Sequence, residues 1–378
     1  VELAFRYLES RLIAITGTNG KTTTTRLCGH VMAAAEWSAL TAGNVGRPLS
    51  EVALLDEQPD WVVAELSSFQ LADCERFLPD IGVVLNLAPD HLDRYASVES
   101  YYADKRRLFD RATPDSRWIV NADDPDVLAM VRDVPGRVYR LSVAGPVEPG
   151  AFLSPEGDLC LNLPGRRERW LGRDELRLLG AHNVTNALAA GLAAALAGCP
   201  GEAIAAGLRS FEGLPHRLRP VTELGGVLWV NDSKATNCSA TRVALRAFDR
   251  KIVLLLGGRD KGEPYASLIP DLRGRLRGVV AFGEAAPKIV ADLKDAVPEL
   301  RVAGGMEALV RAAADMARPG DVVLFSPACS SYDMFPNYKE RGWALERRIR
   351  DLCRECAPAE ASRRADEASE GFTGEGRE

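Results

Sequence analysis

The chain has 378 residues, of which 46% are hydrophobic and 26% charged, and its formal net charge is −6. This length is more than one compact core usually holds, so we expect two domains. Lysine and arginine are scattered among acids instead of forming a basic stripe, which argues against a nucleic-acid partner. Chemistry on small molecules is therefore the favoured class of function.

Eight cysteines are dispersed along the chain, and several, such as Cys28 and Cys160, lie in segments with the pattern of buried helix or strand. This usage indicates a reducing, cytoplasmic compartment. The C-x-x-C at residues 353–356 has no second Cys/His pair nearby, so we interpret it as incidental rather than as a zinc or redox site. No signal peptide opens the chain, and the longest apolar stretch, residues 184–198, is shorter than the ~20 residues of a membrane span.

In chain order, strand-like apolar runs alternate with helix-like runs. Strands are predicted at residues 12–16, 61–66, 81–87 and 118–121, and helices at 22–35, 97–112 and 125–132. The alternation is typical of βαβ units with a mainly parallel sheet. Residues 152–179 are turn-rich and alternating, which predicts a small antiparallel appendage, and a helix at 183–197 returns to the core.

Glycine and proline at residues 213–215 predict a domain boundary. A second alternating series follows and predicts a Rossmann-like α/β domain, with elements at 227–231, 239–248, 252–256, 265–276, 278–282, 285–293, 306–317 and 322–326. After Cys356 periodicity is lost, which predicts a disordered tail. The predicted fold class is α/β, with a phosphate-loop domain at 11–215, a C-terminal domain at 216–356 and a tail at 357–378.

The clearest chemical signal is an apolar strand that ends in a glycine-rich turn and opens a threonine-rich helix. Backbone N–H groups at such a turn cradle phosphates, Lys21 can neutralise them, and the Thr22 hydroxyl can ligate Mg²⁺. The strict phosphate-loop pattern has glycine where this chain has Ile15, but the strand–turn–helix context favours a phosphate loop over a plain turn. The predicted ATP-binding residues here are Gly17, Thr18, Asn19, Gly20, Lys21 and Thr22.

Two further predicted strands end in polar groups. Glu65 closes the run at 61–65 and is a candidate metal ligand, although an isolated acid at a strand end is usually only solvated. The strand at 81–87 leads into Asp90, His91 and Asp93, and His91 can ligate a metal or orient a carboxyl group. Three successive strands that end in such chemistry are difficult to explain by packing.

At this point the chain resembles a known family. The GTNGKT turn at 17–22, GNVG at 43–46, ELSSFQL at 65–71 and the N-x-x-x-D-H-L-D pattern at 86–93 are similar to the central domain of Mur ligases, which are ATP-dependent amide-bond ligases. Spacing alone would make Lys105 a surface lysine on a helix. The resemblance instead implies that CO₂ carbamylates Lys105, which then provides oxygen ligands for a second Mg²⁺.

The resemblance also implies roles for the other residues of these motifs. The implied catalytic residues are Lys21, His91 and Lys105; the metal ligands are Thr22, Glu65, His91 and Lys105; and the substrate contacts are Asn44, Ser67 and His91. The family has an N-terminal domain that holds UDP, and this sequence lacks its motifs. We therefore expect residues 1–10 to be a linker stub with Leu3, Phe5 and Leu8 exposed, and the chain as given to ligate poorly.

Segments at 180–187 and 214–218 resemble those from which the family holds adenine and ribose phosphates, so Asn186 and Arg217 are expected to bind ATP. Interpreted without the family, Asn183 is a helix N-cap and Pro215 a hinge. The NDSKATN segment at 231–237 has the form of ligases that add D-glutamate. It implies that Asp232 holds the ribose, Lys234 a phosphate and Thr236 the amino acid.

The glutamate pocket is implied by two later loops. The loop at 256–262 contains Lys261, which is expected to pair with the glutamate side-chain carboxylate. SPACSSYDMF at 326–335 resembles the loop that cups glutamate, with Tyr332 in place of a small apolar residue and Tyr338, further on, in place of phenylalanine. The implied pocket residues are Thr236, Lys261, Ser331, Tyr332 and Tyr338.

Together these motifs imply a monomeric enzyme that uses ATP and Mg²⁺ to join D-glutamate to UDP-N-acetylmuramoyl-L-alanine through an acyl phosphate, in peptidoglycan synthesis. One alternative is a folylpolyglutamate synthetase, against which the NDSKATN and SPACSSYDMF segments count. The other is a non-catalytic nucleotide-binding module, because no nucleotide-sugar domain is present in the sequence.

Overall fold

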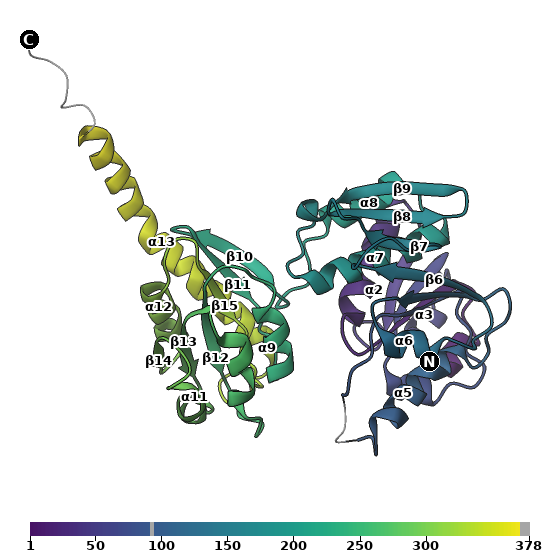
Figure 1. The fold of residues 1–378 in the computed structure, drawn as a ribbon, viewed down its shortest axis with the longest axis horizontal. Coiled ribbons are helices and arrows are strands. Elements are labelled where there is room, and N and C mark those ends of the chain that lie inside the picture. Colours follow the sequence, from purple (N-terminus) through teal and green to yellow (C-terminus); the bar gives the residue numbers. More distant parts are fainter. Residues whose placement is uncertain (91–93, 371–378) are drawn as a thin grey trace, which may run out of the picture. The chain divides into compact units, whose positions relative to one another are not determined.

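The computed structural model describes residues 1–90 and 94–370 (Figure 1). The chain divides into two compact units, Val1–Gly213 and Leu214–Glu378. Each unit is built around its own sheet. His91 and Asp93, which the sequence marks as site residues, lie outside the described residues.

The first unit contains a nine-stranded sheet in the order β2-β3-β1-β4-β5-β6-β7-β8-β9. In this order all strands from β2 to β7, including β1, run parallel, and β8 and β9 complete the sheet with antiparallel pairing. The predicted appendage is therefore a continuation of the main sheet, because β7 pairs with β6. The strands are β1 (Arg11–Thr16), β2 (Ala39–Gly43), β3 (Trp61–Glu65), β4 (Ile81–Val84), β5 (Arg117–Asn121), β6 (Arg137–Ser142), β7 (Gly150–Leu153), β8 (Asp158–Leu163) and β9 (Arg166–Gly172).

Helices cover both faces of this sheet. On one face, α2 (Lys21–Ala34), α7 (Ala181–Ala197) and α8 (Gly201–Ser210) pack against one another. Alternate strand residues, such as Leu12 and Ala14 of β1, face a second hydrophobic cluster on the other side. That cluster includes residues of α1 (Glu2–Phe5), α3 (Leu49–Ala53), α4 (Ser68–Ala72), η1 (Arg107–Phe109) and α6 (Pro125–Met130), while α5 (Val98–Arg106) precedes η1 and η2 (Arg173–Glu175) follows β9.

The first residues pack more closely than the sequence suggests. Leu3 is exposed, as predicted, but Phe5 and Leu8 are partly buried against the same cluster, and Phe5 meets Phe77 edge to face at 5.2 Å. The expectation of an exposed apolar stub is therefore wrong for Phe5 and Leu8, because α1 lies along α3 rather than projecting from the unit.

The second unit contains a six-stranded sheet in the order β10-β11-β15-β12-β13-β14, parallel except for the β10–β11 pair. The strands are β10 (Arg219–Leu224), β11 (Val227–Asn231), β12 (Ile252–Gly257), β13 (Leu276–Phe282), β14 (Leu300–Ala303) and β15 (Val322–Phe325). Sequence pattern did not predict β2, β10 and β14, which lie at sheet edges, or β6, which lies between β5 and β7.

Helices also flank this sheet. A hydrophobic cluster joins one face to α12 (Met306–Met316) and α13 (Tyr338–Glu370), while α9 (Cys238–Leu245), η3 (Tyr265–Leu268), α10 (Ile269–Leu272) and α11 (Ala286–Leu293) form a second group. Helix α13 continues to Glu370, past the point where we predicted disorder. Alanine, glutamate and arginine dominate that stretch, and their helix propensity extends a helix that is already formed.

Candidate active site

Three parallel strands bring the predicted chemistry of the first unit to one edge of the sheet. Strand β1 lies between β3 and β4, with Ile15 in register with Glu65. The phosphate loop, Glu65 and the segment that leads to Asp90 therefore all follow the carboxyl ends of adjacent strands. Sites in open α/β sheets form at this edge.

The phosphate loop is held by the segment after β4. Backbone N–H groups of Thr18 and Asn19 donate to the main-chain and side-chain oxygens of Asn86, at 2.9 and 2.8 Å. Gly20 is the N-cap of α2 and has a left-handed φ of 83°. A Cβ at Gly20 would collide with Oδ1 of Asn186, so only glycine fits between the loop and α7.

Two lysine ammonium groups converge on one carbonyl of this loop. Lys21 Nζ donates to the Gly17 oxygen at 3.0 Å and to the Thr18 oxygen at 2.9 Å, and Lys105 Nζ reaches the same Gly17 oxygen at 2.9 Å. Lys105 is 1% exposed, so the reading of it as a surface lysine is wrong. Its burial, and secondarily the charge of Lys21, lower the pKa of Lys105 to about 7 against the opposing influence of Asp90.

Glu65 is a buried carboxylate with one oxygen available. Its Oε1 accepts from Nδ2 of Asn44 at 3.1 Å, and the Asn44 backbone N–H donates to the Glu65 carbonyl at 2.8 Å. Within the described residues its Oε2 is buried and accepts no hydrogen bond. A buried, unsatisfied carboxylate oxygen suits a cation, so Glu65 fits the predicted metal site. Those residues contain no group of three His, Cys, Asp or Glu side chains placed to hold a metal.

Tyr101 is a site residue that sequence reasoning missed. Its hydroxyl lies 3.3 Å from Oγ1 of Thr18, and the Lys105 ammonium lies 4.6 Å from its ring centroid. Burial raises the pKa of Tyr101 to about 12. Tyr101 and Lys105 are four residues apart on α5 and so share one helix face, which was the available signal.

The start of α7 contacts the loop through two asparagines. Asn186 accepts from Oγ1 of Thr24 at 3.2 Å and donates to Oδ1 of Asn183 at 2.9 Å. Asn183 is not the helix N-cap that the sequence predicted: Gly180 is, and Asn183 donates to the Leu179 oxygen at 2.6 Å. The glycine's φ of 89° lets the chain turn into the helix two residues earlier.

Ser67 caps α4 through a reciprocal pair of bonds with Gln70, so its backbone position is fixed beside Glu65. Phe69, two residues further on in α4, stacks on Tyr95, and their ring centroids lie 5.3 Å apart. Thr22 opens α2 and is partly exposed at the loop.

In the second unit, Asp232 follows β11 and is engaged within the protein. Its Oδ1 accepts from the Leu218 N–H at 3.1 Å and its Oδ2 from the Ser326 hydroxyl at 2.8 Å. Burial raises the pKa of Asp232 to about 7, although both hydrogen bonds and Arg217 oppose the shift. The turn that contains Lys234 is hydrogen-bonded to the turn that contains Arg217, since the Lys234 N–H donates to the carbonyl of His216.

A buried polar network lies beneath this turn. The Asn231 amide donates to Nδ1 of His216 at 3.0 Å and to Oε1 of Glu346 at 2.9 Å. His216 is buried with a left-handed φ of 64°. Lys234 Nζ lies 4.3 Å from the ring centroid of Tyr338, at the start of α13. Asn231 and Glu346 are further residues that sequence reasoning missed, since a helix acid 115 positions away gives no local signal.

Arg341 has a fully buried guanidinium that joins the segment at 231–237 to the loop at 326–335. It donates to the carbonyls of Cys329 and Ser330 at 3.0 and 3.1 Å, and to the carbonyl and hydroxyl of Ser233 at 2.9 and 3.1 Å. Burial lowers the pKa of Arg341 to about 10, so it stays charged at neutral pH. Sequence reasoning missed this residue too.

The predicted glutamate pocket contains both buried and exposed members. Ser331 is buried, Thr236 and Tyr338 are partly buried, and Lys261 and Tyr332 are exposed. The loop with Lys261 is fixed by its neighbour Asp260, which accepts from Lys288 at 3.2 Å and from the Tyr265 hydroxyl at 3.1 Å. Lys261 thus projects from an anchored loop.

The chain was compared with known proteins. Residues 15–194 match the Mur ligase middle domain, and residues 216–329 match the glutamate ligase domain of Mur ligases. The fold resembles the MurF ligase of Thermotoga maritima solved with ADP, with a TM-score of 0.68 at 20% identity over 93% of this chain and 83% of that one. No helix within the described residues has the length and apolar character needed to cross a membrane.

Sequence relatives are much closer. The chain is 46% identical to the UDP-N-acetylmuramoylalanine–D-glutamate ligase of Acidobacterium capsulatum, over 90% of this chain and 74% of that one. Enzymes of the same name from Anaeromyxobacter dehalogenans and Salinibacter ruber share 46% and 42% identity, over 92% and 93% of this chain and 77% and 78% of theirs. With both domains matched in order, the chain belongs to the Mur ligase family.

Proposed function

We propose that this chain is an ATP-dependent, ADP-forming ligase that joins D-glutamate to UDP-N-acetylmuramoyl-L-alanine in cytoplasmic peptidoglycan synthesis. Relatives at 38–46% identity support the substrate pair, since they carry the D-glutamate ligase name. The observation that carries the proposal is the phosphate loop next to Glu65: the Lys21 ammonium donates to the Gly17 and Thr18 carbonyls, and Oε2 of Glu65 is buried and accepts no hydrogen bond within the described residues, which suits a phosphate and its cation.

In the first step, a carboxylate oxygen of the L-alanyl group attacks the γ-phosphorus of ATP, and the bond to the bridging oxygen breaks to release ADP. Both reactants are negatively charged, so the site must offset their repulsion and align them. The backbone N–H groups of Gly20 and Lys21 and the Lys21 ammonium are suited to hold the ATP phosphates, and Asn186 is suited to fix the loop. Asn44 and Ser67 are proposed to face the substrate.

Magnesium would be held by Thr22, Glu65 and, beyond the described residues, His91. Bound there, it would supply positive charge to the phosphate oxygens. We also propose that Lys105 reacts with CO₂ to form a carbamate, which would add oxygen ligands for a second ion. This reaction needs the neutral amine, and a pKa of about 7 makes that form abundant at neutral pH.

In the second step, the amine of D-glutamate attacks the acyl phosphate, and the tetrahedral intermediate expels inorganic phosphate. The second unit supplies the residues proposed to bring glutamate to that carbon. Lys261 would pair with the side-chain carboxylate, and Arg341 fixes the loops on which other contacts lie. The proposed contacts for glutamate are Thr236, Lys261, Ser331, Tyr332 and Tyr338, and those for the nucleotide are Arg217, Asp232 and Lys234.

Phosphate release measured with ATP, Mg²⁺, UDP-N-acetylmuramoyl-L-alanine and D-glutamate tests the proposal, with each substrate omitted in turn. We expect release only with the full set, a product heavier by one glutamyl residue, and none from Lys21→Ala. Activity with a folate and L-glutamate would favour the folylpolyglutamate alternative. ATP binding without any ligation would favour the binding-module alternative.

A further inference from the structure

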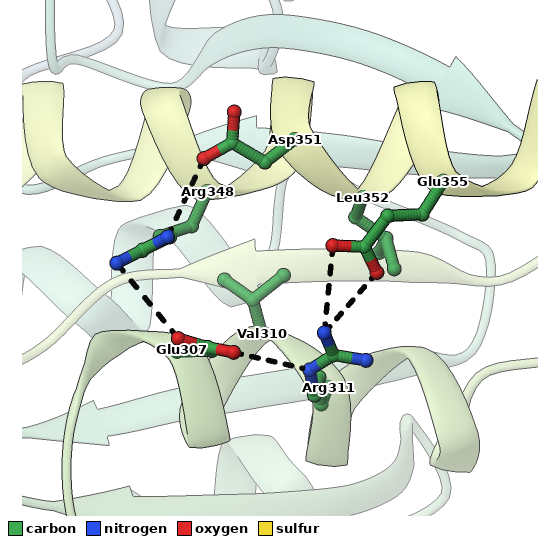
Figure 2. Close-up of a pocket in the computed structure, with 7 residues that line it drawn as sticks. All are labelled: Glu307, Val310, Arg311, Arg348, Asp351, Leu352 and Glu355. Carbon is green, nitrogen blue, oxygen red and sulfur yellow. Dashed lines mark hydrogen bonds and ion pairs between the residues drawn. The ribbon is translucent and has the colours of Figure 1, made fainter.

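Helix α13 has arginines on two sides, and the charge balance differs between them. Toward α12, its Arg348 and the α12 residue Arg311 are surrounded by Glu307, Asp351 and Glu355 (Figure 2). Every guanidinium there has carboxylate partners: Arg311 reaches Glu355 at 3.1 Å and Glu307 at 3.5 Å, and Arg348 reaches Asp351 at 3.5 Å. On this side both arginines are paired with carboxylates, and the ion pairs hold α13 to α12.

Toward β10, arginines outnumber carboxylates around a cavity of about 370 Å³. Its charged lining residues are Arg219 from β10 and Glu346, Arg350 and Arg354 from α13, which gives three positive charges against one negative. Within the described residues Arg219 makes no ion pair. Arg350 meets Glu346 at 3.5 Å and Arg354 meets Asp351 at 3.8 Å, both near the limit of contact. The lining therefore has an excess of positive charge, on arginines whose ion pairs are long or, for Arg219, absent within the described residues.

We propose that this cavity, the β10–α13 cavity, binds a phosphate group. Guanidinium groups recognise phosphate oxygens through paired N–H donors, and three arginines line this cavity, one from a strand and two from a helix. The same chemistry would bind inorganic phosphate or a phosphate ester. Neither the proposed ligation nor the family match assigns a ligand to this cavity, and none of its lining residues is among the predicted nucleotide or glutamate contacts.

The cavity is linked to the buried network under Asp232 by one side chain. Glu346 accepts from Asn231 with Oε1 and meets Arg350 with Oε2. A phosphate in the cavity would compete with Glu346 for Arg350. Replacing Glu346 by glutamine removes the competing charge but keeps an oxygen that can accept from Asn231, so it should strengthen phosphate binding while a neutralised arginine weakens it.

The test is to follow the arginine Nε–Hε signals of the whole protein by NMR during titration with inorganic phosphate, pyrophosphate or glycerol phosphate, at constant ionic strength. Signals lost in Arg219→Gln and Arg350→Gln identify the two reporters, which separates this cavity from phosphate bound at Lys21. We expect saturable shifts at both reporters, and at least about tenfold weaker binding when either arginine is neutralised. A preference among the three ligands identifies the inorganic or the esterified source.

Arg348→Gln is the matched control, because it removes the same charge from the opposite side of α13. It should change phosphate affinity by less than about twofold, whereas Glu346→Gln should raise affinity by about threefold or more. Circular dichroism checks that each variant folds, and Arg219→Met replaces Arg219→Gln if the latter does not. No saturable shift up to about 10 mM phosphate, or equal weakening by Arg348→Gln, would overturn the proposal.

Discussion

Among the residues that the structure describes, each unit contains one fully buried lysine or arginine, and burial lowers the pKa of the two to different extents. Lys105 and Arg341 are 1% and 0% exposed, and both donate to main-chain carbonyls. Within the described residues neither makes an ion pair. Burial lowers the pKa of Lys105 to about 7 but that of Arg341 only to about 10.

The two pKa values explain why a lysine occupies one position and an arginine the other. A buried lysine becomes an amine that is partly neutral at physiological pH and can react, whereas a buried arginine stays a charged donor with a fixed fork of N–H groups. Lys105 donates to the Gly17 carbonyl of the phosphate loop. Arg341 donates hydrogen bonds to two loops and so holds them together as a clamp.

The largest effect is expected from changing Lys105. Lys105→Arg keeps the positive charge but removes the reactive amine, and Lys105→Ala removes both, so each should lower ligation by at least about 100-fold. Added short carboxylates such as acetate or propionate should partly restore Lys105→Ala, since they can replace the carbamate oxygens, but should not restore Lys105→Arg. Phosphate release measures both.

If Lys105→Arg kept full activity, the positive charge alone would be what the site requires. The contrast between a reactive lysine and a structural arginine would then fail.

The reciprocal change, Arg341→Lys, tests the clamp. An ammonium cannot span the carbonyls of Cys329 and Ser233 together, so buried acceptors lose their donors. We expect the free energy of unfolding of the second unit to fall by about 2–4 kcal/mol. We also expect the KM for D-glutamate to rise more than the KM for ATP. Chemical denaturation and steady-state kinetics measure the two effects. Unchanged stability would show that the hydrogen bonds of Arg341 are dispensable.

A smaller effect is expected at Lys261, the exposed cation of the second unit. Lys261→Ala should raise the KM for D-glutamate by about tenfold or more and leave that for ATP unchanged, because one charge-assisted contact to the substrate is lost. Lys294→Ala, which removes another exposed lysine of the same unit, is the control. A larger change in the KM for ATP than in that for D-glutamate would show that this loop belongs to the nucleotide site.

The smallest effect per pH unit concerns the pH dependence of stability. The pKa of Lys105 falls from 10.5 to about 7 on folding, so between these pH values the unfolded chain binds the proton and the folded chain does not. Stability should therefore rise with pH across this window, by at most about 1.4 kcal/mol per pH unit, relative to Lys105→Met in CO₂-free buffer. Equal pH profiles for both proteins would contradict the lowered pKa.

Sequence pattern predicted most elements because buried parallel strands and the helices between them have strong periodicities. It failed at β2, β6, β10 and β14, which are only partly buried and so lack a continuous apolar run. It also placed the start of α7 at Asn183, because a capping side chain is a stronger signal than the conformation of Gly180.

The site was predictable where its chemistry follows a strand, as at the phosphate loop and Glu65. The burial of Lys105 was not, because α5 is a polar helix whose inward face is decided by contacts with a loop 88 positions earlier. Only the family resemblance singled it out. Arg341 and Glu346 lie in a helix rich in charge, and no local feature distinguishes them from its exposed arginines.

The most direct test of the account is ¹³C NMR of the protein with ¹³C-labelled bicarbonate near neutral pH. We predict a carbamate signal in the wild-type protein that is absent from Lys105→Arg and retained in Lys261→Ala. A wild-type spectrum without this signal, or a signal that persists in Lys105→Arg, would contradict the claim that burial makes Lys105 a reactive amine at the phosphate loop.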